Sequence, residues 1–349
     1  MKTAALEKYT VRDVLEYRGN PQLYHTISDV GTIEDALALM HIHDIVSLPV
    51  FSSASHSFVD IVSVYDIRDY IIYSKDLEEE VEFQLLSGRP SGNKTVLQDT
   101  IAQVVQSRKH ASQEISALAP LEELVRMFAI HGQHRVLVAD FDVDGSAAKG
   151  SAVQVPESDS KRKRLRSIDS GCSSVSLQSG DAHETVCGLT QYDVVRFIQH
   201  HNHELGSTLD APALVVATTH ESLRPSEPRH LPHLTVRDTA LNALRLLHDT
   251  HNSALPVVDY DGRLITEVAG TNLRSLTTYN IGLLGRPVLA YMFGMHLPVT
   301  NPYFIHENFT LSQVMSGLLK MNCRRAWLVD SDERPIAVLS LTDVLNHFL

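Results

Sequence analysis

The feature that most constrains this chain is a phrase that recurs four times. The four copies begin at Ile33, Leu121, Ala240 and Leu311. In the first, second and fourth copies, apolar residues fall at positions i, i+3, i+4 and i+7, which places them on one face of a helix. Each copy then enters a β-rich run whose centre lies 16 residues after the first residue of the copy. A constant spacing in four copies predicts a repeated structural unit.

The second half of each copy has the same order of elements. A turn rich in Asp and Gly, such as 259–263, is followed by a second short strand and then by another helix. The joints between these strands and helices include residues 66, 193, 272 and 343. In the second copy the joint lies about 40 residues farther along the chain than in the others. The sequence therefore predicts a helix–strand–strand–helix unit, with an insert in the second copy.

Two phrases, SALPVVDYDGRLI and RPIAVLSLTDVL, resemble the cystathionine-β-synthase (CBS) domain. The resemblance covers most of residues 9–349 except the insert. It implies an α+β fold of four CBS repeats, arranged as two tandem CBS pairs (Bateman modules). The pairs are expected at 1–205 and 206–349. Among four-repeat proteins, the chain is most similar to the γ subunits of AMP-activated protein kinase and their fungal and plant relatives.

The insert, residues 142–185, is rich in Ser, Gly and Asp and has few large apolar residues. Such a segment cannot bury enough surface to offset the entropy lost on ordering, so we expect a disordered loop. It contains the basic run Lys161 to Arg166, followed by Ser167. This run is interpreted first as a solvated charge run. A nuclear import signal and a basophilic kinase site are the alternatives.

A Ser/Thr-x-x-Asp motif stands at three of the four strand–helix joints. One interpretation is a capping box, in which the motif satisfies backbone N–H groups at the start of a helix. The CBS resemblance implies a second interpretation, in which the carboxylate binds ribose hydroxyls and the hydroxyl contacts a phosphate of an adenine nucleotide. The third copy has Ala269 and Asn272 instead, which predicts a weakened site. The candidate residues are Ser63, Asp66, Thr190, Asp193, Ser340 and Asp343.

A basic pair precedes the first strand of alternate copies. The second copy has His134 and Arg135, and the fourth has Arg324 and Arg325. Surface charge at a turn is the simpler interpretation. The resemblance to kinase γ subunits implies contacts with nucleotide phosphates, which suit the fork of donors on Arg and the titratable ring of His.

Composition excludes several classes of protein. A formal net charge of −12 argues against non-specific nucleic-acid binding. Three scattered cysteines form neither a disulfide framework nor a metal-ligand pattern and suit a reducing compartment. His200, His201 and His203 lack metal-ligand spacing, so no metal is expected. The longest apolar candidate, 281–295, is interrupted by Arg286 and Pro287, so no membrane span is expected.

No catalytic constellation is found, so we expect a non-enzyme with no cofactor. The leading hypothesis is a regulatory sensor that binds AMP, ADP or ATP and acts on a protein kinase or another protein partner. The alternative is a non-catalytic adaptor or scaffold whose CBS clefts are mostly empty. A cytoplasmic location is expected, and a nuclear one if the run from Lys161 to Arg166 acts as an import signal.

Overall fold

The computed structural model describes residues 4–19, 25–55, 57–108, 114–131, 133–139, 187–217, 231–299 and 302–349. The predicted insert, with the basic run at 161–166, lies outside the described residues, so its predicted disorder stays a prediction.

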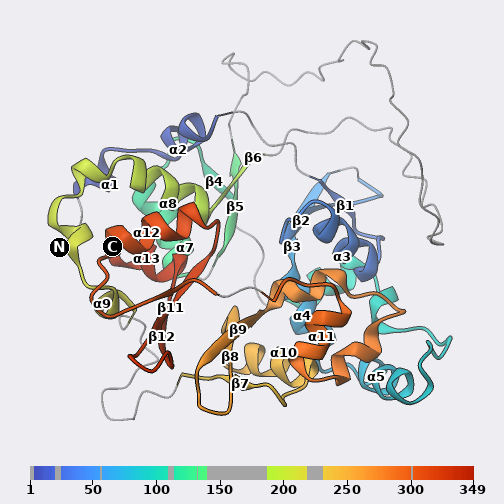
Figure 1. Ribbon diagram of the computed structural model, residues 1–349. Helices are drawn as coiled ribbons and strands as arrows, with labels where there is room; N and C mark the ends of the chain where they lie inside the picture. The colour runs from blue at the N-terminus through green and yellow to red at the C-terminus, as the bar shows by residue number, and fades with distance from the viewer. Residues whose placement is uncertain are drawn as a thin grey trace, which may run out of the picture.

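Four similar units make up most of the described chain (Figure 1). Each contains a three-stranded sheet, a helix between the first two strands and a helical segment after the third strand. Unit 1 comprises β1 (Ile27–Ser28), α3 (Ile33–Ile42), β2 (Ser47–Phe51), β3 (Phe58–Ser63) and α4 (Val64–Ile71). Unit 2 comprises β4 (Glu114–Ser116), α7 (Leu121–Ala129), β5 (Arg135–Ala139), β6 (Cys187–Thr190) and α8 (Gln191–His200). Unit 3 comprises β7 (Leu234–Thr235), α10 (Ala240–Asp249), β8 (Ala254–Val258), β9 (Leu264–Ala269) and the 3₁₀ helix η4 (Gly270–Ser275). Unit 4 comprises β10 (Phe304–Ile305), α12 (Leu311–Lys320), β11 (Arg325–Val329), β12 (Pro335–Ser340) and α13 (Leu341–His347).

The first helix of each unit begins at the residue that the repeated phrase predicts. In units 1, 3 and 4 a threonine side chain at the N-cap accepts a hydrogen bond from a backbone N–H in the first turn. In unit 2 the helix follows Pro120, whose missing N–H costs nothing at a helix start. The apolar positions of each helix are buried, so the predicted helix starts and core faces are confirmed.

The sheets share one topology, in which the central strand pairs parallel with a short first strand and antiparallel with the third. In unit 1, Ile27 lies opposite Val50 in the parallel pair and Leu48 lies opposite Val62 in the antiparallel pair. The first strands were missed by the sequence analysis because two or three residues are too few to show an alternating pattern. The predicted α+β fold, with small sheets flanked by helices, is confirmed.

Unit 3 departs from the predicted final helix. The segment after β9 forms the 3₁₀ helix η4 and then turns away at Leu276. It starts with a glycine and has no hydroxyl cap, because Ala269 stands where the other units have Ser or Thr. A Cβ on Gly270 would lie 2.9 Å from the ring of Tyr65, so the ring of unit 1 requires a glycine here.

Four helices outside the units complete them in a crossed pattern. Helix α2 (Val11–Arg18) precedes unit 1 but bridges to unit 2 through Thr10 and Pro120, whereas α6 (Ile101–Ser107) turns back to unit 1. The helices that flank unit 3 are arranged in the same way. Helix α9 (Ala213–Ala217) bridges to unit 4, and α11 (Val288–Gly294) bridges to unit 3. In each half, the helix that precedes the first unit therefore connects to the second unit, and the helix that follows the first unit connects back to it.

The remaining helical segments lie at the edges of the units. They are α1 (Ala4–Glu7), α5 (Lys75–Ser87), η1 (Val96–Gln98), η2 (Asn202–Glu204), η3 (Gly206–Asp210) and η5 (Ile281–Gly285). Helix α5 packs on η5, where Gly282 and Gly285 leave room for Gln84 and Leu85.

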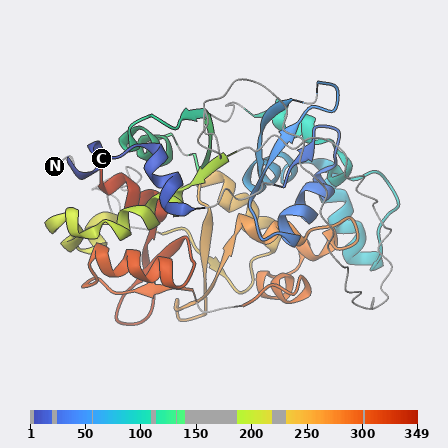
Figure 2. The same ribbon diagram turned by 90° about the horizontal axis from the view of Figure 1, so that it is seen from above.

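Two large hydrophobic cores run across the halves of the sequence. One core joins units 1 and 3, and the other joins units 2 and 4, which lie on opposite sides of the molecule in Figures 1 and 2. A third, small cluster of Ala254, Ala269 and Trp327 joins the sheets of units 3 and 4. The predicted boundary near residue 206 stays a prediction, because each large core contains residues from both halves of the chain.

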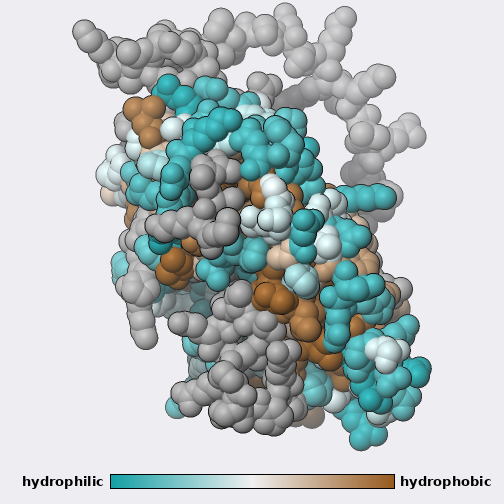
Figure 3. Space-filling model, turned by 90° about the vertical axis from the view of Figure 1, so that its left-hand side faces the viewer, coloured by the Kyte–Doolittle hydropathy of each residue, from teal (hydrophilic) through white to brown (hydrophobic). Residues whose placement is uncertain are grey.

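The face of the molecule in Figure 3 is mainly hydrophilic, with apolar side chains gathered in smaller patches. Within the described ranges, no helix is both long and apolar enough to cross a membrane.

Candidate functional site

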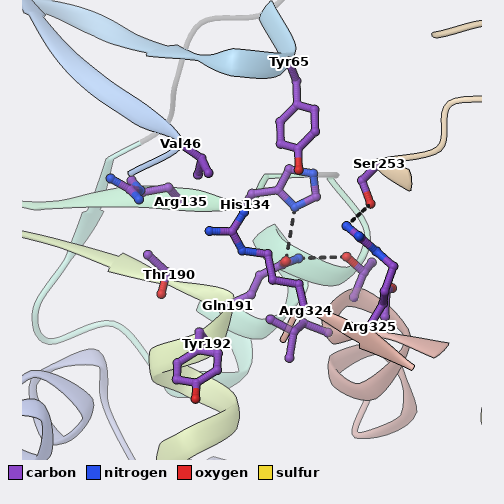
Figure 4. Close-up of a pocket in the computed structure, with 13 residues that line it drawn as sticks. Val46, Tyr65, His134, Arg135, Thr190, Gln191, Tyr192, Ser253, Arg324 and Arg325 are labelled. Carbon is purple, nitrogen blue, oxygen red and sulfur yellow. Dashed lines mark hydrogen bonds between the residues drawn. The ribbon is translucent and has the colours of Figure 1, made fainter. Parts of the chain in front are cut away.

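A cavity of about 110 Å³ lies where the four units meet (Figure 4). Room for one water requires roughly 10–15 Å³, so the space can hold a phosphate-sized anion. Every unit contributes to the wall. The lining residues are Val46 and Tyr65 from unit 1, His134, Arg135, Thr190, Gln191 and Tyr192 from unit 2, Ser253 from unit 3, and Arg324, Arg325, Ser340, Leu341 and Thr342 from unit 4.

Both predicted basic pairs line this one cavity, rather than separate clefts. The first member of each pair, His134 or Arg324, keeps exposed surface because it faces the cavity. The second member opens the central strand, and its guanidinium reaches across to the neighbouring unit: Arg135 to the carbonyl of Ser47 and Arg325 to Ser253. Successive side chains of an extended segment point to opposite sides, which explains this division.

The junction between the sheets of units 3 and 4 holds Arg325 firmly. Its Nη1 donates to Oε1 of Glu267 at 2.7 Å, and its Nη2 donates to Oγ of Ser253 at 3.2 Å. The other carboxylate oxygen of Glu267 accepts from Nε1 of Trp327 at 2.6 Å. Arg325 is 7% exposed, so its charge is neutralised inside the protein rather than by solvent.

Gln191, the first residue of α8, connects units 2 and 4 at the cavity wall. Its Nε2 donates to the carbonyl of Phe128 at 3.3 Å and to Oγ1 of Thr342 at 2.8 Å. Its Oε1 lies 3.1 Å from Nδ1 of His134 (Figure 4). These contacts hold the imidazole ring in a fixed orientation.

The cavity is electropositive. Burial within the surrounding protein lowers the pKa of His134, and the positive charges of Arg324 and Arg325 lower it further. Burial also lowers the pKa of Arg324, while a hydrogen bond with Tyr65 opposes that shift. Among the described residues, no carboxylate forms an ion pair with Arg324. A cation that faces a cavity without a carboxylate partner is suited to binding an anion.

The Ser/Thr-x-x-Asp motifs form the predicted capping boxes. In each motif, Oδ2 of the aspartate accepts from the backbone N–H and the hydroxyl of the cap residue, at 2.6 to 2.9 Å. Of the predicted site residues, the structure brings six to the cavity: His134, Arg135, Thr190, Arg324, Arg325 and Ser340. The others, which do not line it, are Ser63, Asp66, Asp193 and Asp343.

In the first half of the chain, an arginine from a flanking helix approaches the aspartate of each box. Nη1 of Arg108 lies 3.3 Å from Oδ2 of Asp66, and its Nη2 lies 2.5 Å from Oδ2 of Asp60. Nη1 of Arg18, at the end of α2, lies 3.9 Å from Oδ2 of Asp193. In unit 1, therefore, the carboxylate predicted to bind ribose already has a cationic partner.

Unit 3 retains only part of the motif. Oδ1 of Asn272 accepts from the backbone N–H of Ala269 at 2.7 Å, so the amide replaces one of the two cap bonds. The position in α11 that corresponds to Arg108 of α6 is the buried Met295. Unit 3 therefore has neither the carboxylate nor the arginine that correspond to Asp66 and Arg108 of unit 1.

The sequence analysis missed Tyr65, Gln191, Ser253 and Thr342 as lining residues. Gln191 and Thr342 lie one and two residues after the predicted cap residues Thr190 and Ser340, so this position could have identified them as candidate lining residues. Tyr65 and Ser253 come from units without a basic pair, and only the packing of the four units reveals them.

Within the residues that the structure describes, no group of three or more His, Cys, Asp or Glu could hold a metal ion. Burial raises the pKa of the Cys323 thiol to about 11, so this cysteine is protonated and unreactive at neutral pH.

Residues 295–349, which contain unit 4, match the family model of the CBS domain. A comparison with curated protein sequences found no match. A Methanocaldococcus jannaschii protein, described as a proposed archaeal homologue of γ-AMPK, has a similar structure, with a TM-score of 0.61 and 15% identity over 98% of this chain and 100% of that chain. An uncharacterised conserved protein from Pyrococcus horikoshii aligns with a TM-score of 0.45 and 15% identity over 93% of this chain and 96% of that chain.

Proposed function

We propose that this chain is a regulatory protein that binds an adenine nucleotide, with a phosphate group of the nucleotide in the central cavity. The observation that carries the proposal is the convergence of Arg324 and His134 on one space. Thr342 lines the same space, and because its hydroxyl accepts from Gln191, its own hydrogen can be donated to a phosphate oxygen.

Support for an adenine nucleotide, rather than another anion, comes from the CBS match and the shared fold. The matched segment includes Arg324, Arg325, Ser340 and Asp343. The similar M. jannaschii protein is described as a proposed γ-AMPK homologue, which supports a regulatory role. We extend the proposal to a non-catalytic chain that passes nucleotide occupancy to a protein partner, of which a kinase is one candidate, in the cytoplasm or the nucleus.

Calorimetric titration of the full chain with AMP, ADP and ATP tests the proposal. We expect binding below millimolar concentration and a loss of about ten- to a hundredfold in affinity for Arg324→Gln, because a charge-assisted hydrogen bond contributes roughly 1.5–3 kcal/mol. Arg89→Gln is the matched control, because Arg89 is exposed and does not line the cavity. If wild type binds no adenine nucleotide at millimolar concentration, the proposal is wrong.

The second candidate is an adaptor or scaffold with mostly empty CBS clefts. The ion pair between Arg108 and Asp66 favours it in unit 1, and the amide of Asn272 favours it in unit 3. Absence of nucleotide binding, together with an unchanged unfolding temperature in ATP, would favour this candidate.

A further inference from the structure

The hydrogen bonds of Gln191 determine which nitrogen of His134 carries a proton. A backbone carbonyl can only accept, so the amide NH₂ of Gln191 must face Phe128. Its Oε1 then faces Nδ1 of His134 and accepts from it. Nδ1 therefore carries hydrogen in the neutral ring, and Nε2 is the atom that gains or loses a proton.

Charges around His134 disfavour a proton on Nε2 while the cavity holds no anion. Arg135 follows it directly in the chain, and Arg324 and Arg325 face it from unit 4. From α4 of unit 1, Tyr65 lies with its ring centroid 5.6 Å away and the Asp66 carboxylate partly offsets the positive charge. The contact from α8 is the uncharged Gln191.

An anion between Arg324 and His134 would reverse this balance. It would offset the arginine charges and attract a proton to Nε2, which could then donate to the anion. The cap carboxylates accept hydrogen bonds from their own helix starts. His134 is therefore the group in the cavity wall best placed to change its charge when an anion enters.

We propose that the central cavity binds its anion together with a proton, which is taken up on Nε2 of His134, so that affinity rises as pH falls. Gln191 acts as a positioning residue by holding Nδ1 protonated. The inference rests on the anion site of the proposed function and adds to it a dependence on pH.

The direction in which anion affinity changes with pH follows from thermodynamic linkage. Before the anion enters, the pKa of His134 is below its ordinary value of 6.5, so the ring is neutral at pH 7.5. If the anion raises this pKa by one unit, the protonated protein binds the anion tenfold more tightly than the neutral protein. Affinity then increases as pH falls through the pKa of the bound state and levels off below the pKa of the unbound state.

The test is a nuclear magnetic resonance titration of histidine ring protons between pH 5 and 8, with and without sulfate. Sulfate stays a dianion over this range, so its own ionisation does not contribute. We expect sulfate to raise the pKa of His134 by about one unit or more. His134→Asn identifies the resonance by its loss, and the exposed His233, which does not line the cavity, is an internal control.

A second measurement separates this inference from the proposed function. His134→Asn keeps a donor for Gln191 but cannot take up a proton, so its sulfate affinity should not vary with pH. An unchanged pKa of His134 in saturating sulfate overturns the inference, even if nucleotides bind. A raised pKa in sulfate without any nucleotide binding supports the inference and contradicts the proposed function. If the sulfate affinity of His134→Asn still rises at low pH, a group other than His134 takes up the proton, and the inference is also overturned.

Discussion

The two basic pairs occupy the same place in their repeats but are fixed differently. In unit 4, Arg325 bonds to the carboxylate of Glu267, which also accepts from the buried Trp327. In unit 2, Arg135 donates to the carbonyl of Ser47 at 3.4 Å. The junction of units 3 and 4 thus combines a charge pair with an apolar cluster, and no such cluster occurs between the described sheets of units 1 and 2. One sequence slot therefore provides a cation for the cavity in both units, and in unit 4 it also forms part of a charge-paired aromatic junction.

The largest expected effect is on this second junction. Trp327→Ala should lower the free energy of unfolding by about 3–5 kcal/mol, because Trp327 is 1% exposed and its removal leaves a cavity between the sheets. Urea unfolding followed by circular dichroism measures the change. Phe293→Ala is the control, because Phe293 is 81% exposed. A loss below about 1 kcal/mol would show that the junction contributes little to stability.

The next effect concerns the charge at the same junction. Glu267→Gln leaves the buried Arg325 without its carboxylate, so we expect a loss of roughly 1.5–3 kcal/mol in unfolding free energy. The same urea experiment measures it, with the exposed Glu307→Gln as the matched control. Equal stability of the two variants would mean that the pair between Arg325 and Glu267 contributes little to the free energy of unfolding.

A smaller effect compares the cap carboxylate of unit 4 with the amide of unit 3. Asp343→Ala should weaken adenine-nucleotide binding by about tenfold or more, whereas Asn272→Ala should change it little. Asp343→Asn is the sharper variant, because it gives unit 4 the amide that unit 3 already has and can retain a bond to the cap backbone, as Asn272 does. Titration calorimetry at one salt concentration and pH 7.5 measures the affinities. If both Asp343 variants bind the nucleotide as tightly as wild type, the Ser/Thr-x-x-Asp motif caps the helix and does not bind the nucleotide.

Local signals in the sequence were sufficient for the first helix of each unit and for six of the residues that line the cavity. The starts at Ile33 and Leu311 follow from apolar residues at i, i+3, i+4 and i+7, which mark one face over two helical turns, so no tertiary information was needed. The basic pairs and hydroxyl caps could also be identified within one repeat.

Contacts between distant segments could not be predicted from one sequence. The wall of the cavity depends on Gln191 meeting Thr342, 151 residues away, and on Tyr65 meeting His134 across two units. The crossed packing of α2 and α6 depends on which unit leaves an apolar face uncovered, and the periodicity of a helix does not identify its partner.

The cores that join units 1 with 3 and 2 with 4 also affect how the chain folds during synthesis. Ile198 of unit 2 is buried in the same core as Phe348, at the end of the chain. A ribosome adds about 5–20 residues per second, so the apolar face around Ile198 is made roughly 8–30 s before its partner. Until the last helix emerges, that face is exposed to other proteins. In a nascent chain of this architecture, the early repeats therefore carry apolar surface that only residues made later can cover.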